Sequence, residues 1–138
     1  MPTNTEFTVN LENQPGTLAQ ICRALADRNV NILALQAAPT QGKNQVRFVT
    51  DNVNTTKTVL DNEHMSHTET QVAQIRVANR SGELARAAGR LGDANININY
   101  VYSGLESNTN TPILILGVAD AGRASTILEE QAATAARK

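Results

Sequence analysis

The chain has 138 residues and a formal net charge of −1, with 41% apolar but only 3% aromatic residues. This length allows one domain or two very small ones, because a domain averages roughly 150 residues. No run of about 18 apolar residues could span a membrane, and the N-terminal residues lack the pattern of a secretory signal. The single cysteine, Cys22, excludes an internal disulfide. We therefore expect a cytoplasmic protein that binds neither nucleic acids nor membranes.

The chain repeats itself at an offset of 66 residues. Residues 13–32 align with residues 79–98 without a gap and are identical at nine of twenty positions. The identical pairs are Asn13/Asn79, Gly16/Gly82, Leu18/Leu84, Ala19/Ala85, Leu25/Leu91, Asp27/Asp93, Asn29/Asn95, Asn31/Asn97 and Ile32/Ile98. Two copies are too few for a solenoid, so the repeat predicts a compact pseudo-symmetric pair. The predicted domains are residues 1–69 and 70–138.

The first copy is predicted to begin with a strand and a helix. Residues 7–11 alternate between apolar and polar, which is typical of a half-buried strand, and Pro15-Gly16 ends the alternation. Apolar residues then follow helical spacing at Leu18, Ile21, Cys22 and Leu25. Asn29 suits the helix end because asparagine tolerates the left-handed conformation. The further predicted elements are a strand over residues 30–37, a turn over 41–44, a strand over 45–50 and a helix over 52–62.

The second copy is predicted to repeat this order. Residues 65–70 could form the fourth strand of the first copy and run directly into a strand over residues 72–77. A helix follows, with Leu84, Ala87, Ala88 and Leu91 on its apolar face. Residues 96–103 alternate strictly, residues 113–118 are continuously apolar, and residues 121–138 are rich in alanine. We expect these to be two strands and a helix.

The order strand-helix-strand-strand-helix, found twice, predicts the fold class. It indicates an α+β protein of two tandem ferredoxin-like, βαββαβ-type units, with antiparallel sheets and helices on one face of each sheet. The second copy has no evident fourth strand because the chain ends in a helix. An incomplete sheet exposes an edge that can pair with another chain, so we expect a homodimer.

The reactive side chains form no catalytic or metal-binding pattern. His64 and His67 have only Glu63 and Glu69 as nearby carboxylates, whereas a metal site needs three or four ligands. A linker between the copies explains this segment better. Cys22 lies on the apolar helix face and corresponds to Ala88, which favours structural filler over a nucleophile. No nucleotide-binding, hydrolase or zinc motif is present. We therefore expect no enzyme activity, no metal and no cofactor.

The loop between the first strand and the first helix reads Asn-x-x-Gly-x-Leu in both copies. Gly16 and Gly82 let the backbone turn and approach a ligand closely. The following helix presents unpaired N–H groups that suit a carboxylate, and Asn13 or Asn79 adds a donor and an acceptor. Such a loop could hold a free amino acid. Alternatively, the glycines only turn the chain and the asparagines only cap the helix.

At these residues the sequence resembles the ACT domain family. The motif runs over residues 11–19 and continues into Asn29-Val30-Asn31-Ile32, and in the second copy over residues 77–85 and Asn95-Ile96-Asn97-Ile98. The resemblance covers nearly the whole chain and is similar in particular to stand-alone proteins of two ACT domains. It implies a ferredoxin-like fold that regulates amino-acid metabolism. It also implies an amino-acid ligand between ACT units, and a regulated enzyme, if any, that is a separate protein.

In this family the loop after the first strand holds the ligand together with the second strand of a neighbouring unit. The matching positions here are Asn13, Gln14, Pro15, Gly16, Thr17, Leu18, Asn31 and Ile32, and in the second copy Asn79, Arg80, Ser81, Gly82, Glu83, Leu84, Asn97 and Ile98. The second copy departs from the pattern: Ser81 replaces proline, and Glu83 would repel a carboxylate ligand. A protein-interaction module that has lost ligand binding is the alternative function.

Overall fold

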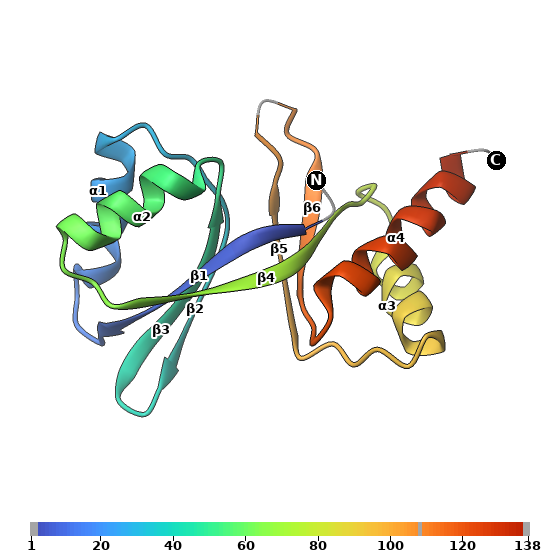
Figure 1. The fold of residues 1–138 in the computed structure, drawn as a ribbon, viewed down its shortest axis with the longest axis horizontal. Coiled ribbons are helices and arrows are strands. Elements are labelled where there is room, and N and C mark those ends of the chain that lie inside the picture. The colour runs from blue at the N-terminus through green and yellow to red at the C-terminus, as the bar shows by residue number, and fades with distance from the viewer. Residues whose placement is uncertain (1–2, 108, 137–138) are drawn as a thin grey trace. The chain divides into compact units, whose positions relative to one another are not determined.

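The computed structural model describes residues 3–107 and 109–136 of the chain (Figure 1). By their contacts, these residues divide into two compact units. The first unit is Thr5–Thr70, and the second combines residues 3–4 with the described residues from Gln71 onward. The described residues form six strands and four helices, so the fold is α+β and its element order is consistent with βαββαβ-type units.

The first unit has the predicted layers, a sheet with two helices on one face (Figure 1). Its elements are β1 (Thr3–Glu12), α1 (Thr17–Asp27), β2 (Ile32–Thr40), β3 (Lys43–Thr50), α2 (Val53–Asn62) and the first part of β4 (His67–Arg76). β3 lies between β1 and β2 and pairs antiparallel with both. β4 lies on the other side of β1, which gives the order β4-β1-β3-β2.

Alternation along β1 and the apolar stripe of α1 build the core of the first unit. Phe7, Val9 and Leu11 are buried on the sheet face that the helices cover. Ile21 and Leu25 are the buried residues of α1, as the helical spacing predicts. Partly buried Cys22 packs against this core as filler, and burial raises the pKa of its thiol. A raised pKa disfavours the thiolate, so Cys22 is not an activated nucleophile.

The ends of the first-unit elements follow local backbone preferences. Asn29 has a positive φ of 60° directly after Arg28, the C-cap residue of α1, which confirms the left-handed conformation expected there. The Asn52 side chain caps α2 by accepting a hydrogen bond of 3.0 Å from Thr55 N. Gln41 and Gly42 both have positive φ, 52° and 80°, which suits a two-residue hairpin turn. The turn is therefore shorter than the predicted 41–44, since β3 already begins at Lys43.

The second unit continues with α3 (Glu83–Asp93), β5 (Tyr100–Leu105), β6 (Pro112–Gly117) and α4 (Ala121–Ala136). β6 pairs antiparallel with β4 and with β5. Its core contains Leu91 of α3, Leu116 of β6 and Leu128 of α4. The predicted helix over residues 121–138 is present, except that residues 137–138 lie outside the described residues.

The strand predicted over residues 96–103 begins only at Tyr100, so the prediction was wrong for residues 96–99. The alternation itself is real: Ile96 and Ile98 pack against the second core while Asn97 and Asn99 are exposed. What is missing is continuous pairing, because the register of β5 with β6 starts where Tyr100 faces Gly117. Alternation reports which side is buried and not whether a neighbouring strand is present.

One uninterrupted strand, β4, replaces the two strands predicted over residues 65–70 and 72–77. His67–Thr70 belongs to the first unit and Gln71–Arg76 to the second. His67 is therefore part of a strand and not of a linker, and its ring packs 5.8 Å from that of Phe7. In the second unit, Asn4 Nδ2 donates to Gln74 Oε1 at 2.9 Å. The start of β1 thus contributes to the second unit, in which the sequence showed no fourth strand.

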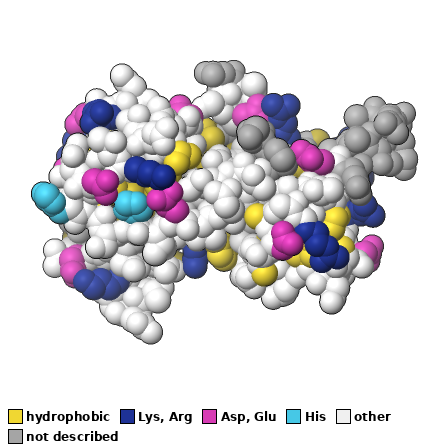
Figure 2. Space-filling model, in the orientation of Figure 1, with side chains coloured by type: hydrophobic (Ala, Val, Ile, Leu, Met, Phe, Trp, Pro, Cys, Tyr) yellow, Lys and Arg dark blue, Asp and Glu magenta, His cyan; other side chains and the backbone are white. Residues whose placement is uncertain are grey.

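The surface carries charges of both signs. On the face shown in Figure 2, acidic and basic side chains are interspersed and do not gather into a patch of one sign. This face therefore offers no patch of positive charge for the phosphate backbone of a nucleic acid. Among the described residues, no helix combines the length and the apolar character that a membrane crossing requires.

Candidate functional site

The first strand-helix loop connects Glu12 to Thr17 and is exposed over residues 12–16. Gly16 adopts a left-handed φ of 92° and is the N-cap residue of α1. The Thr17 hydroxyl donates to Glu12 O at 2.9 Å and to Gln14 O at 3.1 Å, so it ties the loop to the helix start. This bonding fixes the loop backbone without using a side chain at its apex.

The N-terminus of α1 carries no side-chain cap among the described residues. Asn13 therefore does not cap the helix, and its exposed side chain bonds to no other part of the described chain. Thr17 N makes only a long hydrogen bond of 3.4 Å to Gln14 O. The N–H groups of a first helical turn and the positive dipole end form a site suited to an anion. No charged side chain lies in the loop itself between Asn13 and Leu18.

The second loop has the same backbone but different chemistry. Gly82 is the N-cap of α3 with a φ of 89°, and again no side-chain cap is present within the described residues. Glu83 stands in the first turn, where Arg80 Nε donates to its Oε1 at 2.6 Å. That hydrogen bond, together with the charges of Arg80 and Arg86, lowers the pKa of the Glu83 carboxyl. The Glu83 carboxylate therefore already places a negative charge at the N-terminus of α3.

The first loop has neutral residues at the positions equivalent to this ion pair. Arg80 corresponds to Gln14 and Glu83 corresponds to Thr17, both of them neutral. The leucines differ as well: Leu18 packs against the first core, whereas Leu84 is 50% exposed. Arg80 lies in the loop before α3, so the i, i+3 rule for helix surfaces does not indicate this ion pair from the sequence.

Within each unit, the second-strand residues lie at the other end of the sheet from the loop. Glu12, where the first loop begins, faces Lys43, whereas Ile32 faces Thr50. These two positions of β3 are seven residues apart, ~24 Å at about 3.4 Å per residue. Asn31 and Ile32 therefore cannot share a small ligand with the loop of their own unit.

The second unit shows the same separation. Val77 N bonds to Pro112 O beside the loop, whereas Asn99 N bonds to Gly117 O at the far end of β6. Asn97 and Ile98 precede that far end, and the Asn97 amide donates to Asn99 Oδ1 at 3.2 Å. In both units, the loop and the start of the second strand would have to come from different units to form one site. This follows from strand direction and register, which the motif alone does not contain.

Clusters of metal-binding side chains are not seen in the part of the chain that the structure describes. No three His, Cys, Asp or Glu side chains of the described residues come together as metal ligands. His67 Nε2 lies 3.8 Å from Glu69 Oε2, and its Nδ1 lies 3.3 Å from Met65 O. These contacts fix the ring at the start of β4 against the core.

Part of the chain matches a known family, and several solved structures have a similar fold. Residues 5–62 match the ACT domain family. Protein BT0572 from Bacteroides thetaiotaomicron is similar in structure, with a TM-score of 0.80 and 25% identity over 94% of this chain and 88% of that one. The aspartokinase alpha and beta subunits match at a TM-score of 0.62 and 16% identity, over 94% of this chain and 96% of that chain.

The regulatory subunit of aspartate kinase from Thermus thermophilus, in its ligand-free form, also has this fold. Its TM-score is 0.62 at 15% identity, over 94% of this chain and 91% of that chain. No curated protein matches the sequence. The family match ends at residue 62, while these structural likenesses extend over both units.

Proposed function

We propose that this chain, whose residues 5–62 match the ACT domain family, is a regulatory protein of amino-acid metabolism that binds a free amino acid. The observation that carries this proposal is the first loop, where a neutral, uncapped helix N-terminus lies directly behind a left-handed glycine. The regulatory subunit of aspartate kinase, which has the same fold, adds indirect support. The chain itself has no catalytic role in this proposal and acts in the cytoplasm on a separate enzyme.

In the proposed complex, the α-carboxylate of the ligand accepts hydrogen bonds from the first-turn N–H groups of α1. Gly16 keeps the approach open because it has no side chain. Asn13 offers its carbonyl to the ligand ammonium, and Leu18 contributes an apolar wall. The loop residues proposed to line this site are Asn13, Gln14, Pro15, Gly16, Thr17 and Leu18. A zwitterion needs no charged partner here, which fits the neutral loop.

The other wall has to come from a different ACT unit, since Asn31 and Ile32 lie ~24 Å along the sheet from their own loop. We propose that residues 70–138 form a second ACT domain beside residues 1–69, and that the protein associates as a homodimer. The 66-residue repeat supports the tandem arrangement. Ligand binding and association are then coupled, and the coupling must be reciprocal. Sedimentation with and without ligand should show a tighter dimer when ligand is present.

The proposal is tested by melting the protein in the presence of each of the twenty amino acids. A true ligand at 100 times its Kd should stabilise the fold by about 2.7 kcal/mol, which gives a clear rise of Tm. The same amino acid should not shift a variant whose first loop is blocked. No rise of Tm with any amino acid at millimolar concentration would contradict the proposal and favour a protein-interaction module without a ligand.

A further inference from the structure

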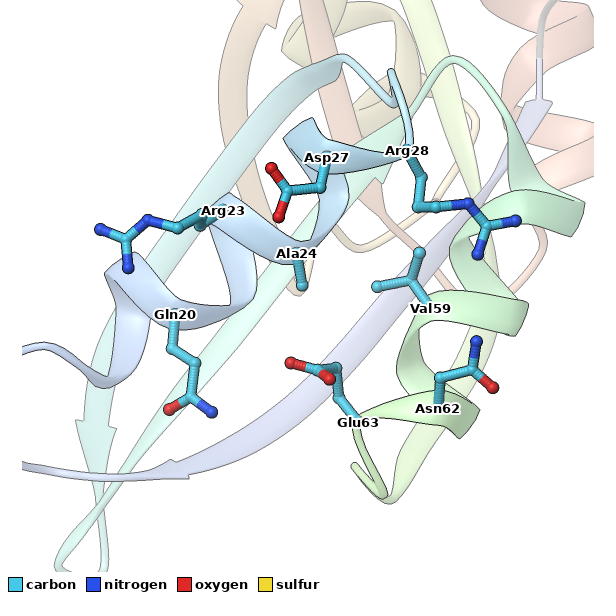
Figure 3. A pocket seen from close by; sticks show the side chains of 8 residues that line it. All are labelled: Gln20, Arg23, Ala24, Asp27, Arg28, Val59, Asn62 and Glu63. Carbon is cyan, nitrogen blue, oxygen red and sulfur yellow. The ribbon is translucent and has the colours of Figure 1, made fainter.

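A groove of about 330 Å³ lies between α1 and α2 in the first unit, away from the strand-helix loop (Figure 3). Its volume is at the lower end of the range of small-molecule sites. The apolar floor consists of Ala24 from α1 and Val59 from α2. Both side chains are short, so no long apolar side chain fills the space between the two helices.

The rim of the groove carries charges of both signs. Arg23, Asp27 and Arg28 come from α1 and its C-terminal end, and Glu63 is the C-cap residue of α2. All four are exposed, yet within residues 3–107 and 109–129 none of them forms an ion pair. The amides of Gln20 and Asn62 add donors and acceptors beside them. Opposite charges thus line one small groove without neutralising each other.

The charged side chains of the rim point in different directions. In Figure 3 the Glu63 carboxylate lies between Gln20 and the floor, and Arg28 extends over Val59 on the side of Asn62. Arg23 extends away from this centre to the opposite side. Arg28 and Glu63 are thus the cation and the anion that lie beside Val59, whereas Asp27 lies beside Ala24.

The second unit does not have the same arrangement. At the repeat offset, Ala94 stands in place of Arg28 and Arg90 in place of Ala24. Arg123 of α4 donates through Nη2 to Ala94 O at 2.9 Å, so a side chain already joins the two helices there. The open, charged groove is consequently a property of the α1 and α2 sequences and not of the fold in general.

We propose that this groove binds a small zwitterion of amino-acid size, with its carboxylate at Arg28 and its ammonium at Glu63. A simple anion would meet Arg28 but also Glu63 and Asp27, and a simple cation would meet the arginines. Only a molecule with both charges pairs favourably with both. This site is independent of the loop site, and it does not require a second ACT unit.

The experiment is an NMR titration of the ¹⁵N-labelled protein with L-alanine, compared with propionate and ethylammonium, each of which carries only one of its two charges. L-Alanine should shift the amide signals of Gln20, Ala24, Asn62 and Glu63, and the two single-charge compounds should not saturate these shifts. Arg28→Gln and Glu63→Gln should each weaken binding about five-fold, which is what a solvent-exposed charge contact of ~1 kcal/mol corresponds to. Both side chains are exposed, so both variants should fold.

Two variants remove matched charges outside the groove. Arg90→Gln changes an exposed arginine in the last turn of α3, and Asp61→Asn changes an exposed acid at the end of α2. Neither should alter the titration. The proposal would be overturned if the groove amides do not shift, or if they shift equally with propionate or ethylammonium. An equal response of Arg28→Gln and Arg90→Gln would also overturn it.

Shifts confined to residues 13–18 would overturn the groove site and support the loop site. Shifts confined to the groove would support the groove site and contradict the loop site.

Discussion

The two strand-helix loops share a backbone and differ in chemistry. Gly16 and Gly82 have φ of 92° and 89°, and each precedes an uncapped helix of eleven residues. The first helix then begins with Thr17, whose hydroxyl bonds to the loop, and the second with Glu83, whose carboxylate bonds to Arg80. In both loops the glycine is retained because the backbone needs a left-handed residue there. The position that follows the glycine has no such requirement, and its charge differs between the two loops.

The largest expected difference comes from blocking each loop in turn. A Cβ at Gly16 or Gly82 would meet no atom within 4 Å, so the fold is disturbed only through the positive φ. Gly16→Val and Gly82→Val should each cost about 1–3 kcal/mol in unfolding free energy. Only Gly16→Val should also abolish the ~2.7 kcal/mol stabilisation by the amino-acid ligand at 100 times its Kd. Thermal melts with and without ligand measure both effects.

Circular dichroism controls for loss of the fold in these variants, and Gly16→Ala and Gly82→Ala replace them if valine prevents folding. An unchanged ligand response in a folded Gly16 variant would remove the first loop from the site. Loss of the response in both variants would show instead that the two loops act alike.

The two leucines that follow the glycines should differ in stability. Leu18 packs against the first core, so Leu18→Ala should cost about 1.5–3 kcal/mol. Leu84 is 50% exposed, so Leu84→Ala should cost less than about 1 kcal/mol. Urea unfolding at neutral pH compares the two. Equal losses would mean that Leu84 is covered in solution, as a partner on the second loop would do.

Proline at the second loop should give a smaller, stabilising effect. Pro15 stands one residue before its glycine, whereas Ser81 occupies the equivalent position before Gly82. Because both glycines adopt the same conformation, Ser81→Pro should fit the loop and stabilise the protein by about 0.5–1 kcal/mol. The midpoint of urea unfolding measures this. Destabilisation would show that the Ser81 backbone differs from that of Pro15.

The smallest effect concerns acid. Hydrogen bonding to Arg80 lowers the pKa of Glu83 from its ordinary value of 4.5 in the folded protein. A depressed folded pKa adds stability above the ordinary value, and this contribution is lost as the pH falls through the folded pKa. Glu83→Gln should therefore flatten the decline of stability below pH 4.5, and Arg80→Gln should do so through loss of the partner. Urea midpoints at neutral and acidic pH test this. An unchanged decline in both variants would contradict the ion pair.

Most elements of the fold could be predicted because local patterns determine them. The structure confirms local features such as the helical spacing of Ile21 and Leu25 and the left-handed Asn29. The strand prediction was wrong for residues 96–99 because alternation shows only which side chains are buried. Strand pairing depends on a partner remote in sequence. The contribution of residues 3–4 to the second unit is likewise a contact across the length of the chain.

The candidate site could be predicted only as two separate pieces. The Asn-x-x-Gly-x-Leu motif identified both loops, and the repeat identified Asn31 and Asn97. In each sheet, the loop and the start of the second strand lie at opposite ends. This separation follows from the register of β3 and β6, which no single motif contains. The groove between α1 and α2 was not foreseen either. Its rim residues are spaced as an ordinary solvent-exposed helix face, and only the packing of two helices brings them together.

The shared strand β4 affects how the gene could be divided. A cut between Thr70 and Gln71 would fall inside a strand, and residues 3–4 would remain on the fragment that does not contain their own unit. The N-terminal fragment would hold the whole first unit, Thr5–Thr70, whereas the C-terminal fragment would lack residues 3–4 of the second unit. Proteolytic separation or domain exchange at the middle of the chain should therefore leave the second unit incomplete, although the sequence repeat places its boundary there. A fragment meant to contain the second unit has to keep the start of β1 as well.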